Sequence, residues 1–258
     1  MRGPFRSVDY QSVFFDERIQ RLPIVHGSHR LIDISPLHHF LIMSLPDELR
    51  ALYTKQKYGI VGRHSAVKTC HWQSRSLNTR GEENCYKNRF YGVPTHRCIQ
   101  MTPSMGHCTQ SCLFCWRATP ETLGVGWEQT QPIEASEDPD SIIDGCIETH
   151  RKQMSGFGGN PNVDREMWKE ACDPVHAAIS LEGEPTLYPR IGELVDAYKS
   201  RGFKSVFIVT NGTTPEVLSA LSSEPSQLYI SLCAQDRVNG IAIRWPRSST
   251  AWREEVSS

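Results

Sequence analysis

Three cysteines with the spacing Cys108-x3-Cys112-x2-Cys115 restrict the fold of this chain more than any other feature. Three thiolates can hold three irons of a four-iron, four-sulfide cluster and leave the fourth iron open. An open metal position allows a cofactor or a substrate to bind to the metal directly. The preceding residues 97–102, Arg-Cys-Ile-Gln-Met-Thr, have the pattern of a β-strand. We therefore expect a strand that leads straight into a cluster-binding loop.

From residue 97 onward the sequence alternates between strand and helix patterns. The expected strands are 97–102, 176–181, 205–210 and 227–232, and the expected helices are 139–154, 189–200 and 214–221. This alternation predicts an α/β fold with a parallel sheet and right-handed crossovers. If such a sheet curls, functional groups gather at the carboxyl ends of its strands. The cysteine loop, the run 182–185 and the run 210–212 all follow an expected strand.

The open iron of such a cluster can take S-adenosylmethionine (SAM) through its amino and carboxylate groups. An electron from the cluster then breaks a carbon–sulfur bond of SAM and produces a 5′-deoxyadenosyl radical. The alternative is a structural zinc site, with His107 or Cys98 as a fourth ligand. Zinc ligands usually have the spacing Cys-x2-Cys, so the triad after a strand favours the radical-SAM cluster.

Cysteine usage and hydropathy bear on the compartment. The chain has 258 residues and nine cysteines, and we find no secretory leader and no apolar run long enough to span a bilayer. In a reducing compartment, clustered cysteines indicate metal binding, so we expect a cytoplasmic protein. The three scattered cysteines, Cys146, Cys172 and Cys233, are expected to be small buried hydrophobic residues.

A basic segment adjoins the cysteines, although the net charge of the chain is only −1. Between Arg50 and Arg97 there are ten Lys or Arg residues against two acids, Glu82 and Glu83. Aromatic residues are interleaved there: Tyr53, Tyr58, Trp72, Tyr86, Phe90 and Tyr91. Cations for phosphates and rings for unstacked bases suit a nucleic-acid surface, and an ordinary solvated basic face is the alternative.

Several separate motifs resemble one enzyme family. They are Gly59-Ile-Val-Gly-Arg-His-Ser-Ala-Val-Lys-Thr-Cys-His-Trp72, Cys85-Tyr-Lys87, Phe90-Tyr-Gly92, His96-Arg-Cys-Ile-Gln-Met-Thr-Pro103 and Cys112-Leu-Phe-Cys-Trp116. Together they resemble archaeal 4-demethylwyosine synthase, the radical-SAM enzyme that builds the tricyclic wyosine base in phenylalanine tRNA. The resemblance covers about residues 46–236.

The resemblance implies two four-iron clusters, SAM and a set of site residues. Cys108, Cys112 and Cys115 match the ligands of the SAM cluster, and Cys70, Cys85 and Cys98 match those of a second cluster. Lys87 matches the lysine that holds pyruvate as a Schiff base; the alternative is a surface lysine that contacts phosphate. Glu182, Gly183 and Glu184 resemble the segment at the SAM amine, and Thr210 and Asn211 the strand end near its ribose. At both places an ordinary loop with capping residues is the alternative.

The implied fold is a partial (βα) TIM-type radical-SAM barrel with an N-terminal, loop-rich, cysteine-bearing segment. We divide the chain into a poorly ordered extension (1–45), a basic cysteine-rich segment with auxiliary cluster ligands (46–96), the partial barrel (97–236) and an atypical tail (237–258). A helix is expected at 47–57. The sequence offers about four strands where a radical-SAM core has six, so we expect a barrel truncated at its C-terminus.

The implied reaction condenses N1-methylguanosine, next to the anticodon of tRNA-Phe, with pyruvate to form 4-demethylwyosine, which is a carbon–carbon lyase chemistry. It needs an external flavodoxin- or ferredoxin-like electron donor, and we expect a monomer that makes no membrane contact. Two other interpretations stay open: a different radical-SAM enzyme with an auxiliary cluster, and a non-catalytic RNA-binding module stabilised by zinc.

Overall fold

The computed structural model describes residues 45–112, 114–118, 133 and 136–233. Within these residues the chain forms one sheet of six strands in sequential order, β1-β2-β3-β4-β5-β6. The strands are β1 (Gly59–Val61), β2 (Ser65–Val67), β3 (Cys98–Thr102), β4 (His176–Ile179), β5 (Ser205–Thr210) and β6 (Gln227–Ile230). The helices are α1 (Asp47–Lys55), α2 (His71–Asn78), α3 (Tyr86–Tyr91), α5 (Pro139–Ser155), α6 (Arg165–Ala171), α7 (Ile191–Ser200) and α8 (Pro215–Ser219), with 3-10 turns η3 (Thr95–Arg97) and η4 (Pro185–Leu187).

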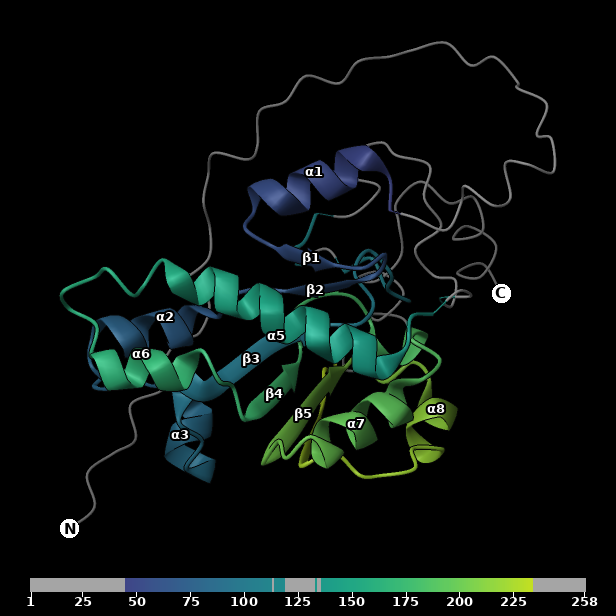
Figure 1. Ribbon diagram of the computed structural model, residues 1–258. Coiled ribbons are helices and arrows are strands. Elements are labelled where there is room, and N and C mark those ends of the chain that lie inside the picture. The colour runs from purple at the N-terminus through teal and green to yellow at the C-terminus, as the bar shows by residue number, and fades with distance from the viewer. Residues whose placement is uncertain (1–44, 113, 119–132, 134–135, 234–258) are drawn as a thin grey trace, which may run out of the picture.

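The α/β prediction is confirmed, since β3, β4, β5 and β6 pair in parallel and helices connect them. All four strands and all three helices expected after residue 97 are present, with small shifts of their ends. Pro139 begins α5 behind the N-cap Asp138, whose carboxylate accepts from the backbone N–H groups of Asp140 and Ser141. The helices α5 and α7 lie along one face of the sheet (Figure 1).

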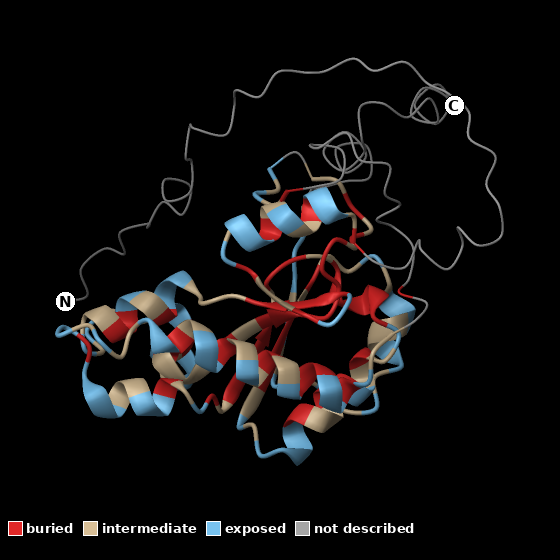
Figure 2. Ribbon diagram, turned by 45° about the horizontal axis from the view of Figure 1, so that its top comes forward, coloured by how far each residue is buried: buried red, intermediate tan, exposed pale blue. Residues whose placement is uncertain are grey.

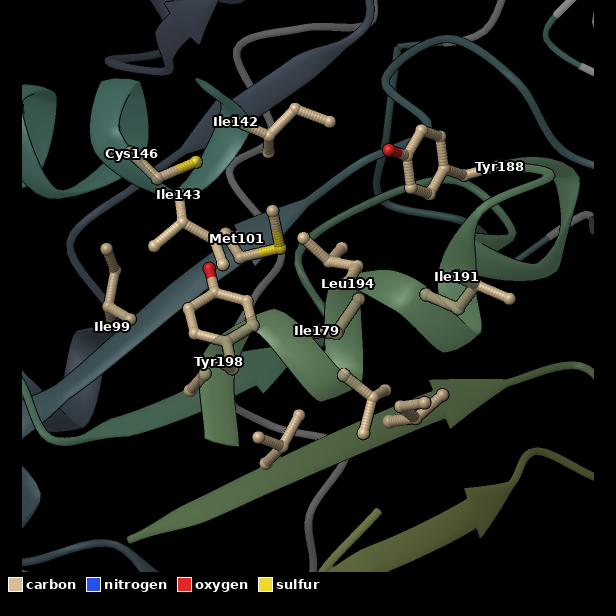
Figure 3. Close-up of a cluster of buried hydrophobic side chains, with 14 of the residues drawn as sticks. Ile99, Met101, Ile142, Ile143, Cys146, Ile179, Tyr188, Ile191, Leu194 and Tyr198 are labelled. Atoms are coloured by element: carbon tan, nitrogen blue, oxygen red, sulfur yellow. The ribbon is translucent and has the colours of Figure 1, made fainter. Parts of the chain in front are cut away.

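The main core fills the layer between these helices and the sheet. Figure 3 shows Ile143 and Cys146 of α5, Tyr198 of α7 and Met101 of β3 directed toward one another. All four side chains are fully buried. The alternate strand positions, such as Gln100 between Ile99 and Met101, therefore face the opposite side of the sheet. That inner face is the one available to a functional site.

The segment 46–96 differs from the loop-rich expectation, because it contains α1, β1, β2, α2 and α3. The strands β1 and β2 are three residues each and antiparallel, and they make the sheet mixed. Strands this short have no readable periodicity, and pairing decides their structure: β2 pairs with β3, and β1 pairs with β2. Helix α1 ends two residues before the predicted end and packs Leu49 and Tyr53 against Met105 and Leu181, in a second buried cluster.

Burial follows the same plan (Figure 2), with buried residues in the sheet and exposed residues on the outer sides of the helices. In the part of the chain that the structure describes, no helix combines the length and the apolar character needed to cross a membrane. The predicted extension, except Leu45, and the predicted tail 237–258 lie outside the described residues. Leu45 itself is 3% exposed and belongs to the second core cluster.

Candidate functional site

The three cysteines of the Cys-x3-Cys-x2-Cys motif lie on the loop after β3 and line one cavity of about 210 Å³. The cavity is at the carboxyl ends of the parallel strands, as predicted. Its walls also include the five residues predicted to contact SAM: Glu182, Gly183, Glu184, Thr210 and Asn211. The structure thus brings eight predicted site residues together from three separate parts of the sequence.

The sulfur atoms of this set have distinct neighbours. The Nδ2 of Asn211 lies 3.8 Å from the Sγ of Cys108. The Nε of Arg117 donates to the Sγ of Cys115 at 2.8 Å. The thiol of Cys112 donates to the Oε1 of Gln110 at 3.3 Å. Burial raises the pKa of the Cys108 thiol, and the charge of Arg117 opposes that rise.

Arg117 is a site residue that the sequence analysis missed. Its side chain is 9% exposed, and its Nη1 lies 3.6 Å from the Oε1 of Glu182. Burial lowers the pKa of Arg117, but Cys108, Glu182 and Cys115 outweigh burial and leave the pKa above its usual value. A cation is therefore held beside two of the predicted ligands. Its position two residues after Cys115 was the available signal.

Glu182 is buried next to Arg117, and its hydrogen bond with Tyr53 connects the cavity to α1. Its Oε1 accepts from the hydroxyl of Tyr53 at 2.6 Å and from the backbone N–H of Gly106 at 3.1 Å. Its Oε2 is buried with no hydrogen-bond partner among the described residues. Burial raises the pKa of Glu182, against the opposing charge of Arg117. Glu182 therefore has a buried acceptor oxygen that remains unused within the described residues.

Glu184 joins the ends of two strands. Its Oε1 accepts from the hydroxyls of Thr210 and Thr186 at 2.6 and 2.7 Å, and its Oε2 accepts from the backbone N–H of Asn211 at 2.7 Å. The carboxylate also caps η4. These contacts match the capping alternative, so Glu184 holds the cavity wall in shape, while contact of this residue with SAM stays a prediction.

The second cysteine set, Cys70, Cys85 and Cys98, lies at the other end of β3. Cys70 and Cys85 are the N-cap residues of α2 and α3, and Cys98 is the first residue of β3. Burial raises the pKa of Cys98 to about 12; Lys87 lowers this pKa, while Cys70 and Cys85 raise it. Cys70, Cys85 and Lys87 therefore each lie within electrostatic range of the Cys98 thiol.

Lys87 is buried, with 9% of its surface exposed, which speaks against the alternative of a surface lysine. It lies in the first turn of α3, and its Nζ is 4.5 Å from the ring centre of Phe207 on β5. The ring of Tyr91 lies 6.1 Å from that of Phe207 and holds α3 against the sheet. A lysine in such an enclosed aromatic setting can act as an amine nucleophile toward a carbonyl.

The inner face of the sheet connects the two cysteine sets. In the register of β3 and β4, Cys98 is opposite His176 and Gln100 is opposite Ala178. Ala178 is in turn opposite Phe207 of β5, the residue whose ring lies against the Nζ of Lys87. Two residues further along, Thr102 and Val209 line the cavity of the first set. Positions two residues apart share a face and are separated by about 6.6 Å along a strand. The row of residues below Lys87 and the row that lines the cavity are therefore neighbours on the inner face of the sheet.

The basic aromatic segment is only partly a surface. Tyr53 and Tyr58 are 0% and 4% exposed and belong to the second core cluster, so these two rings lie on neither a nucleic-acid surface nor a solvated face. Trp72, Tyr86, Phe90 and Tyr91 have exposed rings, as do Phe114 and Trp116 of the cysteine loop. Tyr53 is on the apolar face with which α1 packs in that cluster, whereas the α3 ring of Phe90 is 71% exposed and the rings of Tyr86 and Tyr91 are half-exposed beside Tyr229 and Phe207 of the sheet.

The zinc alternative requires four ligands around one metal ion. No three His, Cys, Asp or Glu side chains converge tightly enough for a single metal ion anywhere in the described ranges. A zinc site needs four ligands about 2.3 Å or less from one ion, whereas cluster thiolates bind separate irons and lie further apart. The donor chemistry, three thiols around a cavity, fits an iron–sulfur cluster with one open iron.

The scattered cysteines follow the expectation in part. Cys146 is fully buried in the main core, and Cys172 packs against a third cluster around Leu77 and Met154. Cys233 differs: it is half-buried and lines the cavity of the first cysteine set. Its position directly after the fourth parallel strand, where the other site residues also fall, was the signal for this.

The fold and the site define a class: an α/β chain with a three-cysteine, cluster-type loop at the carboxyl edge of a parallel sheet. A comparison with protein-family models finds no match. Curated relatives named S-adenosyl-L-methionine-dependent tRNA 4-demethylwyosine synthase are 47% identical over 212 residues in Pyrococcus abyssi and 42% over 193 residues in Methanocaldococcus jannaschii. The mouse relative, which carries the name TYW1, is 36% identical over 210 residues.

Two solved structures agree with these relatives. A structure of TYW1 with a lysine-pyruvate adduct bound superposes with a TM-score of 0.68 at 37% identity and covers 82% of this chain and 65% of that one. A crystal structure of archaeal TYW1 gives 0.60 at 34% identity, over 82% of this chain and 66% of that one. The similarity to tRNA 4-demethylwyosine synthases inferred from the motifs is therefore confirmed over about four fifths of the chain. The chain spans 60% of the length of the archaeal relatives.

Proposed function

We propose that this chain carries the radical-SAM site of a 4-demethylwyosine synthase, which condenses N1-methylguanosine of tRNA-Phe with pyruvate. The observation that carries the proposal is the shared inner face of the sheet. The cavity of Cys108, Cys112 and Cys115 and the enclosed amine of Lys87 open on neighbouring rows of that face. A group activated at the cysteine cavity and a group bound to Lys87 could therefore react with each other on this face without leaving the protein.

In this proposal, the four parallel strands form part of a radical-SAM barrel. Cys108, Cys112 and Cys115 would hold the first four-iron cluster, and Cys70, Cys85 and Cys98 a second one. The first cluster, with SAM and an electron from a flavodoxin- or ferredoxin-like donor, would supply the 5′-deoxyadenosyl radical that takes a hydrogen atom from the methyl group of the nucleoside.

The protein's own residues would then position the reactants. The amine of Lys87 condenses with the ketone of pyruvate and releases water, giving a Schiff base at the inner face. The lysine-pyruvate adduct in the similar TYW1 structure supports this role. Glu184 would fix the ends of β4 and β5 around SAM, and Arg117 would keep a positive charge beside Cys115. The exposed rings of Phe114 and Trp116 would be available to stack against a base that has left its loop.

The test is an anoxic assay with the reconstituted chain, tRNA that carries N1-methylguanosine, pyruvate, SAM and dithionite. We expect 4-demethylwyosine in the digested tRNA, and a mass increase on Lys87 when borohydride is added with pyruvate. Lys87→Ala should keep SAM cleavage and lose both the adduct and the product. Lys55→Ala, an exposed lysine of α1, is the matched control and should behave as the unmodified chain.

Three results would contradict the proposal. Normal product from Lys87→Ala would remove the role of this lysine. Radical-dependent SAM cleavage with no change in the tRNA would indicate a different radical-SAM enzyme. Zinc without acid-labile sulfide in the anoxically purified chain would indicate the zinc-stabilised module.

A further inference from the structure

A fourth cysteine lies in the cavity of the first cysteine set. Cys233 follows the carboxyl end of β6, and its Sγ is 4.0 Å from the Sγ of Cys112. Both thiols donate to the same atom, the Oε1 of Gln110, at 3.3 and 3.5 Å. This shared acceptor holds the two sulfur atoms side by side although 121 residues separate them.

The other thiols of the cavity are engaged elsewhere. The Sγ of Cys115 accepts from Arg117 at 2.8 Å, and Cys108 is buried beside Asn211. Cys112 and Cys233 are both half-buried, so a small solute can reach them. A disulfide has sulfur atoms about 2.05 Å apart. Closing the 4.0 Å distance between the sulfur atoms of Cys112 and Cys233 requires about 2 Å of movement.

We propose that Cys112 and Cys233 form a reversible disulfide in the cluster-free chain, and that this bond withholds Cys112 from the first cluster. The inference rests on the proposed function, because it takes Cys112 as a cluster ligand. The cysteine pair would make assembly of the first cluster depend on the thiol redox state, whereas the cysteines of the second set would remain available.

The oxidant is a small-molecule disulfide such as oxidised glutathione. The thiolate of Cys233 attacks one sulfur of this disulfide, forms a mixed disulfide and releases one glutathione thiolate. The thiolate of Cys112 then attacks the Sγ of Cys233 and releases the second glutathione. Two protein thiols are oxidised by two electrons, and one glutathione disulfide is reduced to two glutathione thiols, which take up the two protons that the protein thiols lose. Excess dithiothreitol reverses both steps.

The experiment uses the full cluster-free chain, incubated anoxically with oxidised glutathione and trapped with N-ethylmaleimide. We expect a trypsin digest to contain peptide 98–117 linked to peptide 205–237, and fragmentation to place the bond at Cys112 and Cys233. Iron and sulfide reconstitution of the oxidised chain should then lose one of its two clusters, measured by metal analysis and by electron paramagnetic resonance. Dithiothreitol before reconstitution should restore that cluster.

Cys233→Ser should take up both clusters with or without oxidised glutathione. Cys172→Ser, which changes a partly buried thiol outside the cavity, should be inhibited like the unmodified chain. A bond between Cys112 and Cys115 instead, or glutathione left on Cys233, would overturn the proposal, as would full reconstitution of the linked chain. If the untreated chain takes up no iron and sulfide, the proposed function fails, while the peptide map still decides whether the pair forms.

Discussion

Arg117 donates a hydrogen bond from its Nε to the Sγ of Cys115 across 2.8 Å, inside the cavity that also contains Cys108 and Cys112. The same guanidinium lies 3.6 Å from Glu182, whose other contacts lead to Tyr53 of α1 and to Gly106. Charge at the cysteine loop is therefore coupled to the packing of α1. A cation beside a thiolate stabilises the thiolate, and it also favours any additional negative charge on a cluster held there.

Replacement of Arg117 should change the reduction potential of the first cluster. We expect Arg117→Gln to make the potential more negative by about 60 mV, equivalent to a factor of about ten for one electron, because a nearby positive charge is lost. Arg117→Lys keeps the charge and should shift the potential much less. A redox titration followed by electron paramagnetic resonance measures both. Equal shifts in the two variants would show that hydrogen-bond geometry, and not charge, sets the potential.

Gly183 should tolerate no side chain. It has φ +72°, and a β-carbon there would lie 2.2 Å from the carbonyl oxygen of Ser104 and 2.5 Å from that of His107. Gly202 has φ +82° with nothing within 4 Å, so it isolates the cost of the backbone conformation. We expect Gly202→Ala to lower the free energy of unfolding by about 1 kcal/mol, and Gly183→Ala by at least about 3 kcal/mol, with loss of cluster uptake. Denaturant titration and iron analysis test this; equal destabilisation would contradict the close packing.

Glu184→Gln should destabilise the carboxyl edge of the sheet. An amide –NH2 would face the donors Thr210, Thr186 or Asn211 in place of an acceptor, and a lost buried charge-assisted hydrogen bond costs about 2 kcal/mol. Glu193→Gln is the control, because Glu193 pairs with Arg190 at the exposed start of α7 and should change stability by about 0.5 kcal/mol or less. Unfolding in urea and the dissociation constant of SAM are the measurements. Tight SAM binding by the Glu184 variant would show that the bonds to β5 are dispensable.

Acid should destabilise the chain through two buried histidines. Burial lowers the pKa of His150 and of His176 to about 4, and the Nε2 of His150 lies 2.9 Å from the carbonyl oxygen of Ala171. An unfolded histidine has a pKa near 6.5 and binds a proton first as the pH falls, so stability is present at neutral pH and declines from about pH 6.5 toward pH 4.

For His150 this decline should amount to about 2 kcal/mol between pH 7 and pH 5. We expect His150→Leu to reduce the pH dependence of the unfolding free energy. The pH dependence that remains in this variant should come in part from His176. Denaturant titrations of the cluster-free chain at both pH values provide the comparison. An unchanged slope in His150→Leu would assign the acid sensitivity to other groups.

Local patterns were enough to predict the second half of the fold. The strand 205–210 was predicted at the bounds that the structure shows, and the helix that starts at Pro139 was predicted within one residue of its end. These elements combine clear hydrophobic periodicity with capping residues, which act over a few residues of sequence. The helix α6 has such a cap in Asp164 and was missed, and β1 and β2 are too short to show a period.

The cysteine spacing by itself predicted a cluster-type site, and the alternation after residue 97 predicted the edge of the sheet at which the cysteine loop lies. Tertiary structure alone decided that Arg117 lies against Cys115, that Lys87 is buried over Phe207, and that Cys233 meets Cys112. The physical reason is distance along the chain. Spacing and periodicity act between neighbours, whereas these contacts depend on the parallel register of β3 to β6, which brings together side chains from different strands.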